Sequence, residues 1–154
     1  MLALLGQGVA TTEAYQRLQG NNPDGTRNPD YEDLIEIANL TDYLILNFYV
    51  GNTDWPGRNW WAGRDRNGGE GFHFYPWDTE TALGFSGLEV NVTGANSAVA
   101  RPYAAVRANR EFCRLFGDRV YRHFSVGGPL YVCCCLASPV RASNPSKVRS
   151  IPLP

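Results

Sequence analysis

The chain has 154 residues, enough for one ordinary domain with a sizeable core but not for two full lobes and a linker. Its 14 basic and 15 acidic residues leave a net charge of -1, which gives no indication of binding to nucleic acid or an anionic membrane. No apolar run approaches the roughly 18 residues of a membrane-spanning helix, and the apolar residues 1–5 are too few for a secretory signal. We therefore expect neither a nucleic-acid partner nor a membrane span.

The first predicted element is a short helix over residues 9–19. Thr11 or Thr12 can cap its start, and Gly20 can end it in the left-handed conformation. The Asn-Asn-Pro-Asp-Gly sequence at residues 21–25 then predicts a turn.

Two further helices are expected before residue 52. A short one is plausible over residues 31–37. The strongest helical pattern begins at Asn39, a good N-cap residue, with Asp42 in the first turn, and it ends at Gly51. This second helix is apolar along much of its length.

A β-hairpin is the simplest interpretation of the next segment. Residues 59–63 and 71–75 are rich in aromatic side chains, and an Asn-Gly-Gly turn signal separates them at residues 67–69. The end of the second strand would place Asp78 in the loop that follows.

The rest of the chain predicts a loop, then helix, then a tail. Residues 84–99 are rich in Gly, Asn, Ser and Thr, with a short strand expected over residues 88–92. The apolar spacing over residues 102–124 fits one helix or a pair broken at residues 117–118. We divide the chain into a folded unit, residues 1–130, and a disordered tail, residues 131–154, rich in cysteine, proline and serine.

Four side chains that offer oxygen ligands lie in the loops around the predicted hairpin: Asp54, Asn59, Asp78 and Glu80. Phosphoryl transfer from ATP needs a carboxylate to orient the attacking hydroxyl, and carboxylate or amide oxygens to hold magnesium. The spacing of Asp54 and Asn59 alone is a weak pattern, but its context adds weight. An apolar helix, a loop with Asp and Asn, and a strand pair leading to another Asp follow one another in the order found in protein kinases.

Three motifs carry a resemblance to a known family: D-Y-L-I-L-N at residues 42–47, T-D-W-P-x-x-N at residues 53–59, and P-W-D at residues 76–78. Together they resemble the core of the CotH-type spore-coat protein kinases, an atypical protein kinase family, over about residues 7–130. The resemblance implies an α+β fold equivalent to the C-terminal lobe of a protein kinase, mainly helical with a small β-hairpin and with the N-terminal lobe missing.

The resemblance also implies a role for each oxygen-bearing side chain. Asp54 would be the catalytic aspartate that orients the substrate hydroxyl, and Asn59 and Asp78 would bind Mg2+ and, through it, ATP. Glu80 stands where the family usually has a second aspartate, so it would be a third metal ligand that reaches one methylene further. The implied reaction is phosphoryl transfer from Mg-ATP to a Ser or Thr hydroxyl of a protein, with coat or cell-surface proteins as the partners and the spore coat or cell surface of a bacterium as the location.

Other interpretations stay open at this level. Family members carry an upstream lobe with a nucleotide-gripping lysine, whereas the only lysine here is Lys147, so the fragment could be truncated or inactive alone. It would then be a noncatalytic kinase-fold module for binding or surface assembly. Asp54, Asn59 and Asp78 could also satisfy only local backbone groups. The tryptophans could form a carbohydrate-binding face or anchor loops in the core: Trp55, Trp60, Trp61 and Trp77.

Overall fold

The computed structural model of the chain describes residues 8–84, 87, 89–95 and 100–131. The chain divides into two compact units, residues 1–122 and residues 123–154. In the second unit the described residues form the end of a helix and a turn, where the Leu130 amide donates to the His123 carbonyl at 3.0 Å. The predicted tail from residue 132 onward, with its three adjacent cysteines, lies outside the described residues.

The helix predicted near the start of the chain is present as α2, Thr12–Leu18. Thr11 is its N-cap, and the Thr11 hydroxyl oxygen accepts a hydrogen bond from the Ala14 amide at 3.2 Å. Gly20 follows the helix with a φ of 71°, a left-handed value that favours glycine. The predicted turn at residues 21–25 is also present.

The helix predicted over residues 31–37 is wrong, because most of this segment runs without helical structure and pairs with a distant part of the chain. The Phe72 amide donates to the Leu34 carbonyl at 3.1 Å, and Ile35 forms a parallel bridge with Phe72. Gly71 permits this close approach, since a Cβ atom there would lie 2.5 Å from the Ile35 nitrogen. Backbone pairing with a distant segment thus replaces local helical bonds.

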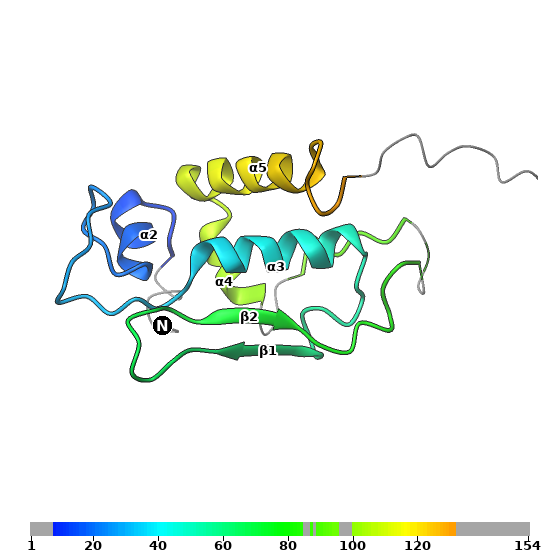
Figure 1. The fold of residues 1–154 in the computed structure, drawn as a ribbon, viewed down its shortest axis with the longest axis horizontal. Coiled ribbons are helices and arrows are strands. Elements are labelled where there is room, and N and C mark those ends of the chain that lie inside the picture. The colour runs from blue at the N-terminus through cyan, green and yellow to red at the C-terminus, as the bar shows by residue number, and fades with distance from the viewer. Residues whose placement is uncertain (1–7, 85–86, 88, 96–99, 132–154) are drawn as a thin grey trace, which may run out of the picture. The chain divides into compact units, whose positions relative to one another are not determined.

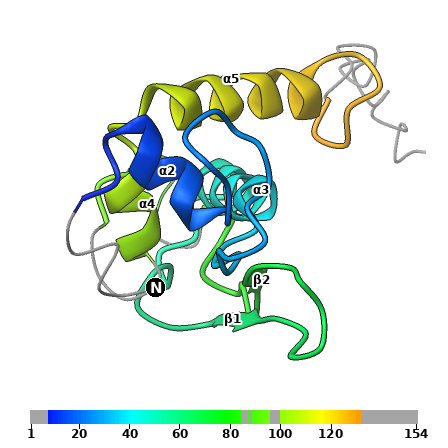
Figure 2. The same cartoon turned by 90° about the vertical axis from the view of Figure 1, so that its left-hand side faces the viewer.

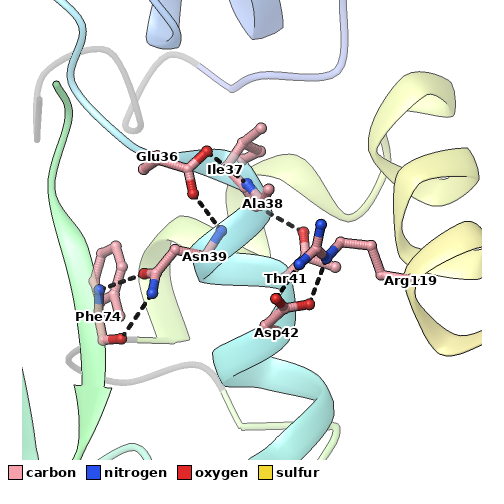
Figure 3. A network of polar contacts seen from close by, with 8 residues as sticks. All are labelled: Glu36, Ile37, Ala38, Asn39, Thr41, Asp42, Phe74 and Arg119. Carbon is pink, nitrogen blue, oxygen red and sulfur yellow. Dashed lines mark hydrogen bonds and ion pairs between the residues drawn. The ribbon is translucent and has the colours of Figure 1, made fainter. Parts of the chain in front are cut away.

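The central helix, α3, spans Ile37–Tyr49 and is followed by Gly51, whose φ is 60°. The predicted end is confirmed, but the predicted N-cap is wrong. Glu36 caps the helix: its carboxylate accepts hydrogen bonds from the amides of Ala38 at 3.3 Å and Asn39 at 2.5 Å (Figure 3). Glutamate is not among the preferred cap residues, which is why the pattern favoured Asn39.

The predicted hairpin is confirmed as two antiparallel strands, β1 (Trp60–Gly63) and β2 (His73–Pro76). Their register pairs Trp61 with Tyr75. Successive side chains of a strand point to opposite faces, so Phe74 is buried whereas Tyr75 is 51% exposed. The hairpin therefore has one face on the core and one open to solvent.

Two helices follow, α4 (Ala100–Val106) and α5 (Arg110–Phe124). The break predicted at residues 117–118 is wrong, because these residues lie inside α5. The break occurs just before α5, where the Asn109 side-chain oxygen accepts a hydrogen bond from the Glu111 amide at 2.8 Å. An Asn side chain that binds the first free amides of a helix starts it more strongly than one glycine disrupts it.

Asn39 and Asp42, predicted as the cap and a first-turn residue of α3, instead connect α3 to other elements. The Asn39 Oδ1 atom accepts a hydrogen bond from the Phe74 amide at 2.6 Å, and its Nδ2 atom donates to the Phe74 carbonyl at 3.3 Å. Asp42 accepts two hydrogen bonds from the guanidinium of Arg119 in α5 (Figure 3). These contacts dock the hairpin and α5 on α3.

Helix α3 lies between the hairpin on one side and α5 on the other (Figures 1 and 2). This arrangement confirms the α+β class. The strand expected over residues 88–92 is wrong for residues 89–92, which form turns and loop, and Leu88 lies outside the described residues. Within the described ranges, no helix has the length and apolar character needed to cross a membrane. The core combines buried side chains from the loops, helices and β2: Val9, Tyr15, Leu18, Leu34, Ile35, Ile37, Leu40, Tyr43, Leu44, Trp55, Phe74, Ala100, Val106 and Phe112.

We predict that Asn39→Ala destabilises the fold, because it leaves the Phe74 amide and carbonyl without their side-chain partners. The loss should be about 1–3 kcal/mol, larger than the roughly 0.5 kcal/mol that alanine gains in helix propensity. Asn39→Asp, which keeps only the acceptor, should lie in between. Urea unfolding followed by circular dichroism measures the difference.

The matched control is Asn67→Ala in the exposed hairpin turn, which should stay within about 0.5 kcal/mol of the unaltered chain. Equal stability of the Asn39 and Asn67 variants would contradict a docking role for Asn39.

Candidate functional site

The loop that carries Asp54 begins where α3 ends and is anchored in the core by its neighbour. The Trp55 side chain is 2% exposed and packs edge-on against Phe48 of α3, with ring centroids 5.2 Å apart. The Arg58 amide donates to the Asp54 carbonyl at 3.1 Å and closes the loop. The core thus holds the loop directly after a partly buried Asp54.

The open end of the hairpin brings two further predicted site residues to this loop. Asn59 immediately precedes β1 and Asp78 follows β2 by two residues, so antiparallel pairing places them at the same end. The Trp77 amide donates to the Asn59 carbonyl at 3.1 Å and continues the ladder past the strands. Hairpin register therefore decides which residues lie at this end.

The Asn59 side chain joins the two loops. Its Nδ2 atom donates to the Asp54 carboxylate Oδ2 at 2.9 Å and to the Asp78 backbone carbonyl at 3.0 Å. Three of the four predicted site residues thus come together. The alternative that Asn59 satisfies only local backbone groups does not describe these contacts. The carbonyl that it binds lies 19 residues away, and the same nitrogen also donates to a carboxylate.

The backbone gives a second reason for the residue types at these positions. Asn59 has a φ of 60° and Asp78 a φ of 47°, both in the left-handed region. Among residues with a side chain, Asn and Asp adopt this conformation most readily. The turns that lead into β1 and out of β2 therefore favour an amide and a carboxylate where the site needs them.

Glu80 differs from the other three. Its side chain is exposed, as is that of Asp78, but within the described residues no hydrogen bond or ion pair joins Glu80 to Asp54, Asn59 or Asp78. Its role as a third metal ligand stays a prediction.

The donor set of this site fits a magnesium ion. Within the described part of the chain, no group of three or more His, Cys, Asp or Glu side chains is arranged to hold a metal ion. Mg2+ does not require such a group, since it keeps several water ligands and typically takes one or two carboxylates together with substrate phosphates. Asp78 and the side-chain oxygen of Asn59 are hard oxygen donors of the kind it takes.

Two residues of this region, Asn52 and Thr81, were not predicted from the sequence. The Asp54 amide donates to Asn52 Oδ1 at 3.1 Å and to Thr81 Oγ1 at 3.2 Å. The Asn52 contact spans two residues and is an Asx turn, which Asn two positions before Asp54 could have suggested. No local pattern marks Thr81, because its contact with Asp54 spans 27 residues.

The four tryptophans do not form one face. Trp55 is buried and serves as a loop anchor, and Trp60 is partly buried, whereas Trp61 and Trp77 are 63% and 62% exposed. Trp61 stands on the outer face of the hairpin opposite Tyr75. The predicted core role thus holds for Trp55, whereas the two exposed tryptophans lie on β1 and directly after β2.

Comparison with protein families gives a match over most of the chain. The family model described as CotH kinase protein matches residues 12–123, which include every residue of this site. No curated protein and no solved structure matches the chain.

We predict that Asn59→Asp destabilises the fold in a pH-dependent way. It replaces the amide donor to Asp54 with a second carboxylate about 3 Å away and retains a residue type that tolerates the backbone conformation. Two charged carboxylates at this distance repel each other and a bound proton relieves the repulsion, so the folded variant loses stability as pH rises. We expect a loss of about 1 kcal/mol at pH 7 that shrinks below about pH 5.

Urea unfolding at pH 4.5 and pH 7 provides the test, with Asn67→Asp in the exposed turn as the control. A loss of equal size at both pH values would show that the Asn59 amide and the Asp54 carboxylate are not coupled.

Proposed function

Because the chain belongs to the CotH kinase protein family, we propose that it transfers the γ-phosphoryl group of Mg-ATP to Ser or Thr hydroxyls of a protein. Family membership makes it a kinase-like protein. The reaction and the roles of single residues are our proposal.

The observation that carries this proposal is the Asn59 amide between the two acidic loops. It holds the Asp54 carboxylate and the Asp78 backbone at 2.9 Å and 3.0 Å. Phosphoryl transfer is catalysed mainly by positioning and charge stabilisation, so a fixed relation between the base and the metal-binding residue is the property it requires.

In this mechanism Asp54 accepts the proton of the attacking hydroxyl. Its Oδ2 atom is held by Asn59, which orients the carboxylate and leaves its Oδ1 atom to face the hydroxyl. The hydroxyl oxygen forms the new bond to the γ-phosphorus, the bond to the β-phosphate oxygen breaks, and ADP leaves. Asp78 and Asn59 would hold Mg2+, which neutralises charge on the phosphate oxygens.

The proposal extends to the fold and the partner. Residues 1–130 would form the lobe of a protein kinase that carries the catalytic and metal-binding side chains, and residues 131–154 a separate tail. Coat or cell-surface proteins would be the phosphoacceptors. Groups outside these residues that bind ATP would be consistent with this proposal. Such groups would change the affinity for ATP, but not which residue acts as the base.

A second function is favoured by the outer face of the hairpin. Trp61 and Tyr75 lie opposite each other and are 63% and 51% exposed, and His73 stacks on Tyr75 with ring planes 15° apart. Exposed aromatic rings of this kind can stack on sugar rings or on a partner protein. This face would serve a noncatalytic binding module, with glycans as the first ligands to test.

For the kinase function, we predict micromolar to millimolar binding of Mg-ATP in isothermal titration calorimetry and transfer of labelled phosphate to Ser- and Thr-containing proteins. Asp78→Ala should weaken binding at least about tenfold, because it removes a charged metal ligand. Asp54→Asn should leave binding within about threefold but lower the transfer rate by about 10²–10⁴-fold, since only the base is lost. EDTA should abolish both.

Asp118→Ala, which removes an exposed carboxylate of α5, is the control and should behave like the unaltered chain. A folded chain that binds no Mg-ATP would contradict the kinase proposal and leave the binding-module function.

For the binding module, we predict that soluble glycans quench the tryptophan fluorescence of the chain. Trp61→Ala should weaken binding about tenfold, in line with the roughly 1–3 kcal/mol that one stacking aromatic contributes at other planar-ligand sites. Tyr121→Ala removes a ring of α5 that is 76% exposed and should change nothing. Equal binding by the two variants would exclude the hairpin face as the ligand surface.

A further inference from the structure

A second set of hydrogen bonds connects the Asp54 loop to the segment after Asp78. The Thr81 hydroxyl donates to Asn52 Oδ1 at 3.0 Å and accepts from the Asp54 amide at 3.2 Å. Asn52 Oδ1 also accepts from the Asp54 amide at 3.1 Å. The three groups form a closed triangle of hydrogen bonds between segments that are distant in the sequence.

This triangle rests on helix α3 through a chain of buried amides. Asn52 and Asn47 are each 1% exposed, and Asn52 Nδ2 donates to Asn47 Oδ1 at 2.9 Å. Asn47 Nδ2 in turn donates to the Tyr43 carbonyl of α3 at 2.8 Å. Because each amide uses its nitrogen as donor and its oxygen as acceptor within the chain, the orientation of both side chains is determined.

The segment after Asp78 is attached to the end of the same helix at one more point. The Leu83 amide donates to the Val50 carbonyl at 2.7 Å, two residues beyond Thr81. Thr81 is therefore held on its C-terminal side by α3, and the triangle passes that constraint to Asp54.

The two connections act on different parts of Asp54. Asn59 binds its carboxylate, whereas Asn52 and Thr81 bind its backbone amide, one bond from the Cα atom that carries the side chain. Together they limit both rotation of the carboxylate and displacement of the loop. A shift of about 1 Å at a reacting group can lower a rate about 10²-fold, so a contact of this kind matters even without touching substrate.

We propose that Thr81, supported by Asn52, is a positioning residue that sets the Asp54 carboxylate relative to Asp78 for phosphoryl transfer. This inference rests on the proposed kinase function. The role belongs to the Thr81 hydroxyl, because this group makes the hydrogen bonds to both Asn52 and the Asp54 amide.

The test compares Thr81→Val, which keeps the shape but removes the hydroxyl, with Thr81→Ser, which keeps the hydroxyl. We expect Thr81→Val to lower kcat about 10–100-fold while the Kd for Mg-ATP stays within about threefold, because the base is displaced and the metal ligands are not. Thr81→Ser should restore kcat to within about threefold. Thr79→Val, at an exposed position two residues before the partly buried Thr81, is the control and should match the unaltered chain.

Amide hydrogen exchange gives a readout that needs no activity. The Asp54 amide should be protected in the unaltered chain and in Thr81→Ser, and should exchange at least about tenfold faster in Thr81→Val while core amides keep their protection. Loss of protection at amides throughout the chain would mean that the valine variant unfolds. The serine and valine variants would then differ in global stability and not in the position of Asp54. That result overturns a positioning role.

The outcomes separate this inference from the kinase proposal. If the unaltered chain transfers phosphate and the folded Thr81→Val variant has the same kcat, the role of Thr81 is overturned. The kinase function is then still supported. An unaltered chain that transfers no phosphate overturns both, whatever the exchange rates show. A lower kcat in Thr81→Val with rescue by serine supports both.

Discussion

The docking of β2 on α3 through Asn39 is the constraint on which the site depends. Phe74 presents an amide and a carbonyl on the edge of β2 that β1 does not use, and the Asn39 side chain pairs with both. Helix α3 thereby serves as the partner of a strand edge, and Phe74 packs on Tyr43 of the same helix with ring centroids 6.0 Å apart. A two-stranded sheet is only marginally stable alone, so this support determines where its open end lies.

Helix α3 supports both the hairpin end and the Asp54 loop of the site. Its N-terminal half carries Asn39, which holds the hairpin and so places Asn59 and Asp78. Its C-terminal half carries Asn47, which through Asn52 holds the backbone of Asp54. One rigid element thus positions both loops, and sites supported by regular elements hold their geometry better than sites built on loops alone.

Side-chain amides make most of these connections. An amide offers a donor and an acceptor without a net charge, so it can pair with backbone groups in the interior at a lower desolvation cost than a carboxylate. Asn109 plays a comparable role away from the site, where its oxygen caps α5 and its nitrogen donates to the Ala10 and Thr11 carbonyls at 3.2 Å and 3.1 Å. In the loops of the site, the formal charges are left to the half-exposed Asp54 and the exposed Asp78.

The sequence by itself determined the elements whose signals are local. A cap at Thr11 or Thr12, the end of α3 before Gly51 and the hairpin between two aromatic runs all follow from residues close to one another, and the hairpin then places Asp78 in the loop after β2. The family motifs likewise predicted the family that the match over residues 12–123 shows. Tertiary structure decided what depends on distant partners. Residues 31–37 pair with Phe72 instead of forming a helix, Glu36 displaces Asn39 as the cap because Asn39 binds β2, and Thr81 reaches the Asp54 amide across 27 residues. A hydrogen-bonding group takes the partner that the folded chain brings to it, and a pattern in the sequence describes only the partners nearby.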